Sequence, residues 1–521
     1  MHCVDRCGAP VNKDVIWVGT DDGNVQLTTD AGKNWQLVSQ SLTGTKTKKG
    51  SVPYGSCVPH VEASKFNPAC AFVVFDDHFR ANWTPYVFVT EDYGKTWKNL
   101  VTKDIDGFGH VIEQDHVKKD LLFLGTEFGF YFSVNRGKEW IKWNSGFPTV
   151  PVRDLAVHPR DNDLIIGTHG RSVYILDDIS FLRELDPAVF NKNAYLFKPA
   201  DTYQFRTFGS SAYSTVGDAE FMGQNREPGV LITYYFNPPE KPEKDKKSGE
   251  KPMPEMMERG RGRRPGSAGK PKFKIEILDE KEKVIRELEI KPDKGINRIT
   301  WDLRGTAPEL PGMSSEPMGR RFSRGRRGLY VLPGTYTVRL PYGDTPLTHS
   351  IQVKPDPRYK MDMEVLKKNY DFSRKVELMM MRVFGAVAEI RQTQKTIQTV
   401  MELVKNADIK NKKELMDEAK ALDEKLKALS EKVRPGSGRQ GISDHSASLS
   451  SKIFMLYMEV ANSFESLTQA AEVQMEKTKT SIEEFFAEYN KLFQTEVEAF
   501  KKHVVDSGVS LFKTFKPLSL N

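Results

Sequence analysis

Three stretches of the sequence share one pattern: LTTDAGKNW at 27–35, VTEDYGKTW at 89–97 and FSVNRGKEW at 132–140. Each has Ser or Thr, then Asp or Asn, then Gly and finally Trp at fixed spacing, between two short runs of β-forming residues. We call these stretches the box turns. Self-similarity of this kind indicates a fold built from one repeated supersecondary unit.

The residue types of the box turns suit a hairpin turn. A short polar side chain can hydrogen-bond to the turn backbone, glycine can take the positive φ that such turns require, and tryptophan can pack between neighbouring sheets. The residues concerned are Asp30, Gly32, Trp35, Asp92, Gly94, Trp97, Asn135, Gly137 and Trp140.

A second repeated turn precedes the box turns and joins two strand-like runs. Its copies are VGTDDG (18–23), LGTEFG (124–129) and IGTHGR (166–171), and the longer FDDHFRANWTPY (75–86) takes its place in the second unit. Each unit is predicted to run strand A, strand B, this turn, strand C, box turn and strand D. Four units are visible, the first without a clear strand A and the fourth without strand D.

The three box turns resemble the Asp-box repeats of sialidase-like and sortilin-like β-propellers. More closely, residues 15–180 resemble the C-terminal part of bacterial sortilin-like or glycosyl-hydrolase BNR-repeat proteins. The resemblance implies an incomplete propeller of about four blades over 1–182, with earlier blades outside this chain. It implies that the box residues are a folding device on the outer rim. It also implies an extracellular, periplasmic or cell-surface protein, although the chain begins without a signal peptide.

In such a propeller, the turns joining strands B and C lie on the face opposite the box turns, where ligands commonly bind. Eight polar candidates fall on these turns: Asp21, Asp22, Asp76, Asp77, His78, Glu127, His169 and Arg171. Paired carboxylates there could act as acid and base in glycoside hydrolysis. A sialidase would need three arginines around a carboxylate, and only Arg80 and Arg171 lie near this face. We therefore expect ligand contact and assign no catalytic residue.

Residues 186–356 contain short strand-like runs separated by turn residues, which predicts an antiparallel β-sandwich. The segment resembles the immunoglobulin-like module that follows the propeller in the same proteins, with Trp301 as a core residue. An insert at 239–271 is rich in Pro, Gly and charge, so we expect it to be disordered.

Two arginine clusters, RGRGRR and RRFSRGRR, could bind polyanions. Their members are Arg259, Arg261, Arg263, Arg264, Arg320, Arg321, Arg324, Arg326 and Arg327. No aromatic residues alternate with them, so base stacking is unsupported and nucleic acid is not the expected partner. Solvated loops are the favoured interpretation.

From Met361 onward the apolar residues recur every three or four positions, which predicts a four-helix antiparallel bundle over 357–505, followed by a tail at 506–521. The fourth helix is predicted to begin near Ser466, where Gln469 would complete a capping box. An intermolecular coiled coil stays open as an alternative.

The composition is that of a globular protein: 38% of the 521 residues are hydrophobic and 28% are charged, which excludes wholesale disorder. No apolar run reaches the roughly 20 residues of a membrane span. Cys3, Cys7, Cys57 and Cys70 have no zinc-site spacing, so we expect no metal. Buried or incidental thiols are favoured over a Cys57–Cys70 disulfide.

These features favour a non-catalytic binding or scaffold protein, without a cofactor, whose ligand is a peptide, protein or glycan. The sequence has no phosphate-binding glycine loop, no Gly-x-Ser-x-Gly elbow and no His-Glu-x-x-His motif. Two alternatives stay open. One is a fragment of a glycoside hydrolase acting on polysaccharide through paired carboxylates, and the other is polyanion binding through the arginine-rich loops.

Overall fold

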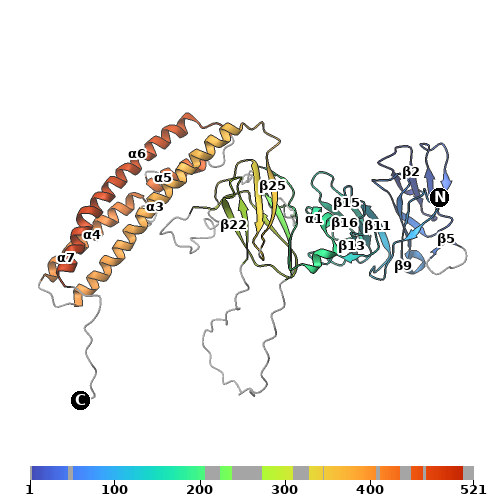
Figure 1. The fold of residues 1–521 in the computed structure, drawn as a ribbon, viewed down its shortest axis with the longest axis horizontal. Helices are drawn as coiled ribbons and strands as arrows, with labels where there is room; N and C mark the ends of the chain where they lie inside the picture. Colours follow the sequence, from blue (N-terminus) through green and yellow to red (C-terminus); the bar gives the residue numbers. More distant parts are fainter. Residues whose placement is uncertain are drawn as a thin grey trace, which may run out of the picture.

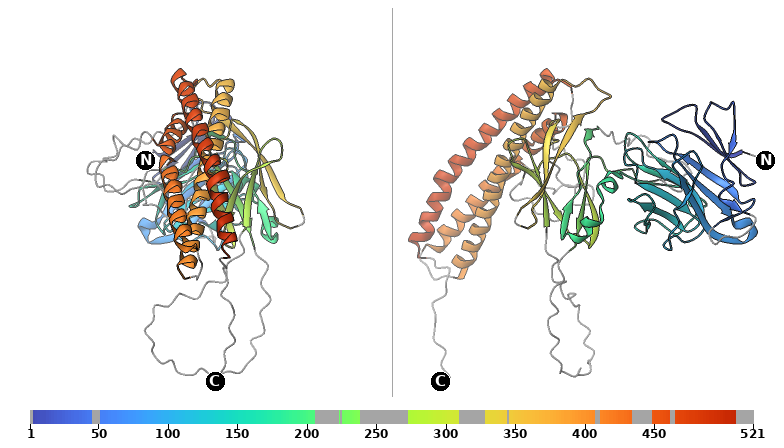
Figure 2. Two further views of the ribbon diagram at one scale, coloured as in Figure 1. Left: turned by 90° about the vertical axis from the view of Figure 1, so that its left-hand side faces the viewer. Right: turned by 45° about the vertical axis from the view of Figure 1, so that its right-hand side comes forward.

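A computed structural model gives the fold of this chain, which is mainly β and then α. It describes residues 3–44, 51–205, 223, 225–237, 273–308, 328–343, 345–406, 411–433, 448–460 and 465–508. Four small sheets at the N-terminal end are followed by two further sheets and then by long helices (Figure 1). The same order is visible in the right-hand view of Figure 2, whereas the regions overlap in the left-hand view.

Sheets 1 and 2 are four-stranded and antiparallel. Across sheet 1 the strands are β1 (Cys3–Gly8), β2 (Ile16–Thr20), β3 (Val25–Thr28) and β4 (Gln36–Leu37). Across sheet 2 they are β7 (Cys57–Ala63), β8 (Ala71–Asp77), β9 (Asn82–Thr90) and β10 (Lys98–Asn99), with η1 (His78–Arg80) between β8 and β9. A short parallel pair, β5 (Thr43–Gly44) and β6 (Val52–Pro53), lies between them in sequence. The prediction that the first unit lacks strand A is wrong, because β1 pairs with β2.

Sheets 3 and 4 repeat the same strand order. Sheet 3 contains β11 (Gly109–Gln114), β12 (Leu122–Thr126), β13 (Gly129–Ser133) and β14 (Ile141–Lys142). Sheet 4 contains β15 (Val152–Val157), β16 (Leu164–Thr168) and β17 (Val173–Leu176). Sheet 4 has three strands, as the sequence pattern predicts for the fourth unit.

Successive sheets stack face to face. β7 packs on β1 and β2, β11 packs on β7 and β8, and β15 packs on β11 and β12. Because sheets 2 and 3 are covered on both faces, β8, β12 and β13 are buried along their whole length.

The three box turns share one pattern of hydrogen bonds. In the second turn, the Asp92 carboxylate accepts from the Thr90 hydroxyl and from the Thr96 backbone N–H, both at 2.9 Å. The Thr90 hydroxyl accepts in turn from the Gly94 N–H at 2.9 Å. Asp30 and Asn135 receive the equivalent bonds in the other two turns, so the amide of Asn135 serves as well as a carboxylate.

The tryptophans of the second and third turns connect each sheet to the one before it. The Trp97 indole N–H donates to the Val38 carbonyl at 3.0 Å, and that of Trp140 donates to the Leu100 carbonyl at 2.9 Å. Both acceptors come directly after the last strand of the preceding sheet. Trp140 is buried, whereas Trp35, which has no preceding sheet among the described residues, is 46% exposed.

Two sheets in the middle of the chain share one buried core. The first is β18 (Ala194–Leu196), β20 (Val230–Phe236) and β23 (Gly295–Trp301), and the second is β19 (Thr202–Gln204), β25 (Leu347–Pro355), β24 (Gly334–Leu340), β21 (Phe273–Leu278) and β22 (Val284–Ile290). The core contains residues of both sheets, including the fully buried Trp301. The pairing is antiparallel except that β19 runs parallel to β25, which the sequence pattern did not predict.

A short segment joins sheet 4 to these middle sheets. It contains α1 (Ser180–Glu184) and η2 (Pro187–Asn191). Arg298 of β23 donates to the carbonyls of Asp177 and Asp178, both at 2.7 Å, and its guanidinium lies 4.7 Å from the centre of the Phe181 ring. Partly buried hydrogen bonds and a cation–π contact therefore hold the two regions together.

The C-terminal region consists of long helices that lie along one another (Figure 1). They are α3 (Met363–Asn406), α4 (Lys412–Val433), α5 (Leu449–Val460), α6 (Gln469–Leu492), η4 (Phe493–Val497) and α7 (Glu498–Asp506). Their apolar faces form a single buried cluster. The predicted capping box at Ser466 is wrong: the hydroxyl of Thr468 caps α6 by accepting from the Ala471 N–H at 3.1 Å.

We expect Trp140→Ala to lower the free energy of unfolding of the sheet region by about 3–5 kcal/mol, because it removes a buried ring and leaves a cavity. Trp83→Ala is the matched control, since that ring is largely exposed, and its cost should stay below about 1 kcal/mol. Six of the seven tryptophans precede residue 182, so urea unfolding followed by tryptophan fluorescence reports this region. Equal losses in both variants would contradict the packing role of Trp140.

Candidate functional site

The eight polar candidates all lie where the second strand of a sheet leads to the third. We call this set of turns the rim. Asp21 and Asp22 follow β2, Asp76 and Asp77 end β8, and His78 begins η1. The remaining three lie between β12 and β13 or between β16 and β17: Glu127, His169 and Arg171.

The centre of the rim is a stack of rings held by an acid. The imidazole of His78 lies parallel to the Phe108 ring, with centroids 4.7 Å apart and 13° between the planes. The Asp76 carboxylate orients this imidazole, because its oxygens lie 2.7 and 2.8 Å from His78 Nδ1. The same carboxylate accepts from the His78 backbone N–H at 2.9 Å.

A second acid–histidine pair lies beside Phe108. His110 meets the Phe108 ring edge-on, and its Nε2 lies 3.0 Å from Glu127 Oε2. Arg153 Nη1 lies 3.2 Å from His110 Nδ1. Since a guanidinium can only donate, Nδ1 accepts and Nε2 carries the proton donated to Glu127. Burial lowers the pKa of His110, with the hydrogen bond to Glu127 opposing the effect and the charge of Arg153 adding to it, which favours the neutral ring.

Asp77 fixes the loop that carries the exposed part of the rim. Its carboxylate accepts from Arg80 Nε at 2.6 Å and from Asn82 Nδ2 at 2.9 Å. Arg80 also donates to the carbonyl of Tyr54 and to the hydroxyl of Ser56. The loop is thereby tied to the segment before β7.

Large aromatic side chains stand exposed on these fixed turns. Phe79 is 87% exposed and lies against the His78 ring, with centroids 4.0 Å apart. Trp83 is 56% exposed, with its ring 5.5 Å from that of Phe108. Phe128 is exposed on the neighbouring turn. The rim therefore presents an apolar surface supported by paired polar groups.

The structure brings together only part of the predicted set. Asp76, Asp77, His78 and Glu127 belong to the ring stack or its supporting pairs. Asp22 forms hydrogen bonds within its own turn, where its carboxylate accepts from the side chains of Thr20 and Asn24. Asp21 and Asp76 both lie close enough to Cys57 to help burial raise its pKa. His169 and Arg171 are exposed, and the structure assigns them no side-chain contact with the stack.

Sequence reasoning missed five residues of this cluster: Phe79, Trp83, Phe108, His110 and Arg153. The available signal was the second unit's rim turn, which is longer than the others and contains both Phe79 and Trp83. Phe108, His110 and Arg153 gave no signal, because they lie in the first strand of a sheet or in the loop before it, and not on the turn between the second and third strands.

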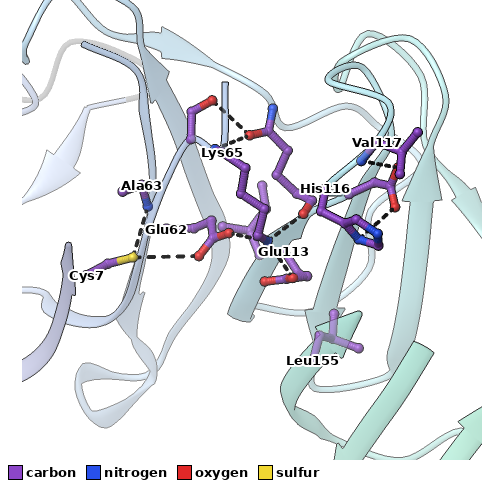
Figure 3. A network of polar contacts seen from close by, with 12 residues as sticks. Cys7, Glu62, Ala63, Lys65, Glu113, His116, Val117 and Leu155 are labelled. Carbon is purple, nitrogen blue, oxygen red and sulfur yellow. Dashed lines mark hydrogen bonds and ion pairs between the residues drawn. The ribbon is translucent and has the colours of Figure 1, made fainter. Parts of the chain in front are cut away.

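A separate buried network joins sheets 1, 2 and 3 at the end away from the rim (Figure 3). Lys65 Nζ donates to Glu62 at 2.8 Å, to Glu113 at 2.6 Å and to the Gln114 carbonyl at 2.6 Å. Cys7 Sγ lies 3.9 Å from Glu62 Oε2. Two carboxylates thus share one ammonium between the sheets.

Burial dominates the electrostatics of this network. It raises the pKa of Glu113 to about 7, with the Glu62 charge adding to the effect and Lys65 opposing it. It also raises the pKa of the Cys7 thiol to about 11, so that thiol is not a thiolate nucleophile at neutral pH. Cys7, Cys57 and Cys70 are free thiols.

Within the described ranges, no group of three or more His, Cys, Asp or Glu side chains is placed to hold a metal ion. Within the same ranges, no helix combines the length and apolar character needed to cross a bilayer. The nine arginines that are candidates for polyanion binding, together with the insert at 239–271, lie outside the described residues.

The family described as Sortilin, neurotensin receptor 3 (Sortilin-Vps10), matches residues 85–180. This match covers sheet 3, sheet 4 and the end of sheet 2, and it supports the sortilin-like propeller resemblance over that stretch. No curated protein matches the chain.

Similar solved structures include two GH74 enzymes and a YCF48 protein. The GH74 enzyme of Niastella koreensis is 12% identical over 33% of this chain and 22% of its own, with a TM-score of 0.25. The GH74 xyloglucanase of Xanthomonas campestris is 14% identical over 45% of this chain and 34% of its own, with a TM-score of 0.26. YCF48, solved bound to D1 peptide, is 12% identical over 45% and 62%, with a TM-score of 0.24. This chain therefore spans less than two thirds of each.

We expect stability to fall as pH rises from about 5 to about 7, by on the order of 3 kcal/mol from Glu113 alone. In this window the unfolded chain has released the Glu113 proton while the folded chain retains it, so higher pH favours unfolding. Glu113→Gln removes this contribution, and its stability relative to the parent should therefore increase with pH.

Urea unfolding of both proteins between about pH 5 and about pH 8 measures the difference. Asp106→Asn, at an exposed carboxyl of the loop before β11, is the control and should track the parent at every pH. A Glu113→Gln curve parallel to the parent's would rule out the raised pKa.

Proposed function

We propose that this chain is a non-catalytic binding or scaffold protein whose ligand, a peptide, a protein or a glycan, contacts the rim. In this proposal, sheets 1 to 4 are four blades of an Asp-box propeller over 1–182, and the box residues serve folding alone. The middle sheets (186–356) form an immunoglobulin-like module, the helices (357–505) form a four-helix bundle, and 506–521 is a tail.

The observation that carries the proposal is the exposure of Phe79 and Trp83 on a turn fixed by the Asp77–Arg80 ion pair and by hydrogen bonds. The exposure of an aromatic ring to water is unfavourable in free energy, and a ligand that covers the ring removes this cost. Such rings dominate the energetics of binding surfaces. Asp77 and Arg80 hold the loop in place before any ligand arrives, so binding would lose little conformational entropy.

The pairing of the rim carboxylates argues against catalysis. Asp76 holds His78, Asp77 holds Arg80 and Asn82, and Glu127 accepts from His110. A retaining or inverting glycosidase needs one acid kept protonated near its substrate. The acid whose pKa is raised to about 7, Glu113, is instead buried between sheets and bound by Lys65.

The partial match to the sortilin family supports this class of function, since the matching description names a receptor. By the same reasoning we propose that the protein acts outside the cytoplasm, as an extracellular, periplasmic or cell-surface protein. This proposal is compatible with a propeller whose further blades come from other polypeptide sequence.

The test is a binding screen against immobilised polysaccharides and a phage-displayed peptide library, with reducing-end release measured on the same polysaccharides. We expect at least one class of probe to bind and no reducing ends to appear. Trp83→Ala should weaken that binding at least about tenfold, since a central aromatic contact is worth about 1.4 kcal/mol or more.

Phe66→Ala is the matched control, because Phe66 is exposed at the opposite end of sheet 2, in the turn between β7 and β8, and its loss should leave binding unchanged. If Trp83→Ala leaves binding unchanged, the ligand does not contact the rim and that part of the proposal is wrong. If the parent releases reducing ends and Glu127→Gln does not, the protein is a glycosidase and the non-catalytic proposal is wrong.

A further inference from the structure

Four exposed aromatic side chains lie on the rim of sheets 2 and 3, and we call them the aromatic surface. Tyr54 and Phe79 are 71% and 87% exposed, and Trp83 and Phe128 are 56% and 39% exposed. Tyr54 is attached to the loop of Phe79 through its carbonyl, which accepts from Arg80 at 2.7 Å. Sheets 2 and 3 each have a neighbouring sheet on both faces, so this surface lies within the stack and not at one of its ends.

Short contacts hold the other three rings together. The centre of the His78 ring lies 4.0 Å from that of Phe79 and 6.4 Å from that of Trp83. The Trp83 ring is 5.5 Å from Phe108. Phe128 packs against the residue before Phe108, because a Cβ added to that glycine would lie 2.8 Å from Phe128 Cδ2.

Two of these rings have a polar hydrogen that is open to a ligand. Neither the Trp83 indole N–H nor the Tyr54 hydroxyl donates to any of the residues that the structure describes. Water can accept from both groups while the rings are exposed. A ligand that covers the rings must supply acceptors in place of water, because a buried N–H or O–H without a partner is unfavourable.

The carboxylates beside the rings already accept hydrogen bonds. Both oxygens of Asp76 lie within 2.8 Å of His78 Nδ1. One oxygen of Asp77 accepts from Arg80, and the other accepts from Asn82. A ligand rich in N–H or O–H donors, such as a glycan with its many hydroxyls, would therefore find these acceptors occupied. The surface instead suits a ligand that is apolar, rich in acceptors and poor in donors.

We propose that the ligand of the rim is a proline-rich peptide in the polyproline II conformation, an inference that rests on the proposed function and narrows its ligand class. Proline rings supply apolar surface, and proline has no N–H that needs an acceptor. The polyproline II backbone makes no internal hydrogen bonds, so its carbonyls can accept from Trp83 and Tyr54. The free peptide already populates this conformation, so binding loses little entropy.

The test compares two libraries of phage-displayed dodecapeptides on the full chain. One library has proline fixed in the pattern Pro-x-x-Pro, and the other has alanine at the same two positions. Alanine keeps a small apolar side chain but restores the N–H and removes the restraint on φ. We expect the binders to come from the proline library, and each synthetic binder should lose at least about tenfold in affinity when its two prolines become alanine.

Variants of the aromatic surface separate the ring from its donor. Trp83→Phe keeps a ring and removes the N–H, so peptide affinity should fall about fivefold, which is the effect of one ordinary hydrogen bond. Tyr54→Phe should cause a similar loss, and Trp83→Ala should cause a larger one. Phe66→Ala, at the opposite end of sheet 2, is the control and should bind as the parent does. Circular dichroism checks that all four variants fold.

The outcomes distinguish this inference from the function on which it rests. Ligands that depend on Trp83 but come equally from both libraries, or are glycans, would overturn the proline-rich ligand and leave the binding function of the rim intact. Full peptide affinity in both Trp83→Phe and Tyr54→Phe would overturn the role of the two donors. If no probe of any class depends on Trp83, the proposed function is itself wrong, and this inference is wrong with it.

Discussion

The hydrogen bond from a box tryptophan to the sheet before it is the contact on which the N-terminal region depends. Trp97 reaches Val38, and Trp140 reaches Leu100, so the turn that closes one sheet also attaches it to its neighbour. The bond satisfies an indole N–H that would otherwise be buried without an acceptor. Because these contacts join adjacent sheets, the region resembles a repeat array whose stability comes largely from nearest-neighbour interfaces.

This stacking also assembles the rim. Asp76 belongs to sheet 2, His110 to sheet 3 and Arg153 to sheet 4, and none of them is close to the others in sequence. The sheets bring Asp76 to His78 and Arg153 to His110, and these two histidines contact the Phe108 ring, each matched to a carboxylate. The exposed aromatics therefore stand on a support drawn from three sheets, and any loss of stacking would disturb the surface that they form.

The sequence predicted the features that are encoded locally. Turn chemistry located the box turns, short runs of β-forming residues between turns located many of the strands, and the helical period located the C-terminal helices. It missed β1 because CVDRCG lacks apolar alternation and becomes a strand through pairing with β2. It misplaced the start of α6 because Ser466 and Thr468 are both good caps and only the fold selects between them. Four of the eight rim candidates joined the cluster, and its aromatic part escaped because it depends on contacts between sheets.

The length of α3 sets the distance between the middle sheets and the far end of the helices. Its 44 residues extend about 66 Å at the rise of an α-helix, and α4 and α6 pack along it, so it behaves as a supported rod and not as a flexible tether. The Asn406 end of α3 therefore lies far from the middle sheets at a fixed spacing. A partner at the far end of the helices and a ligand on the rim would be kept apart, and the chain would act as a spacer between them.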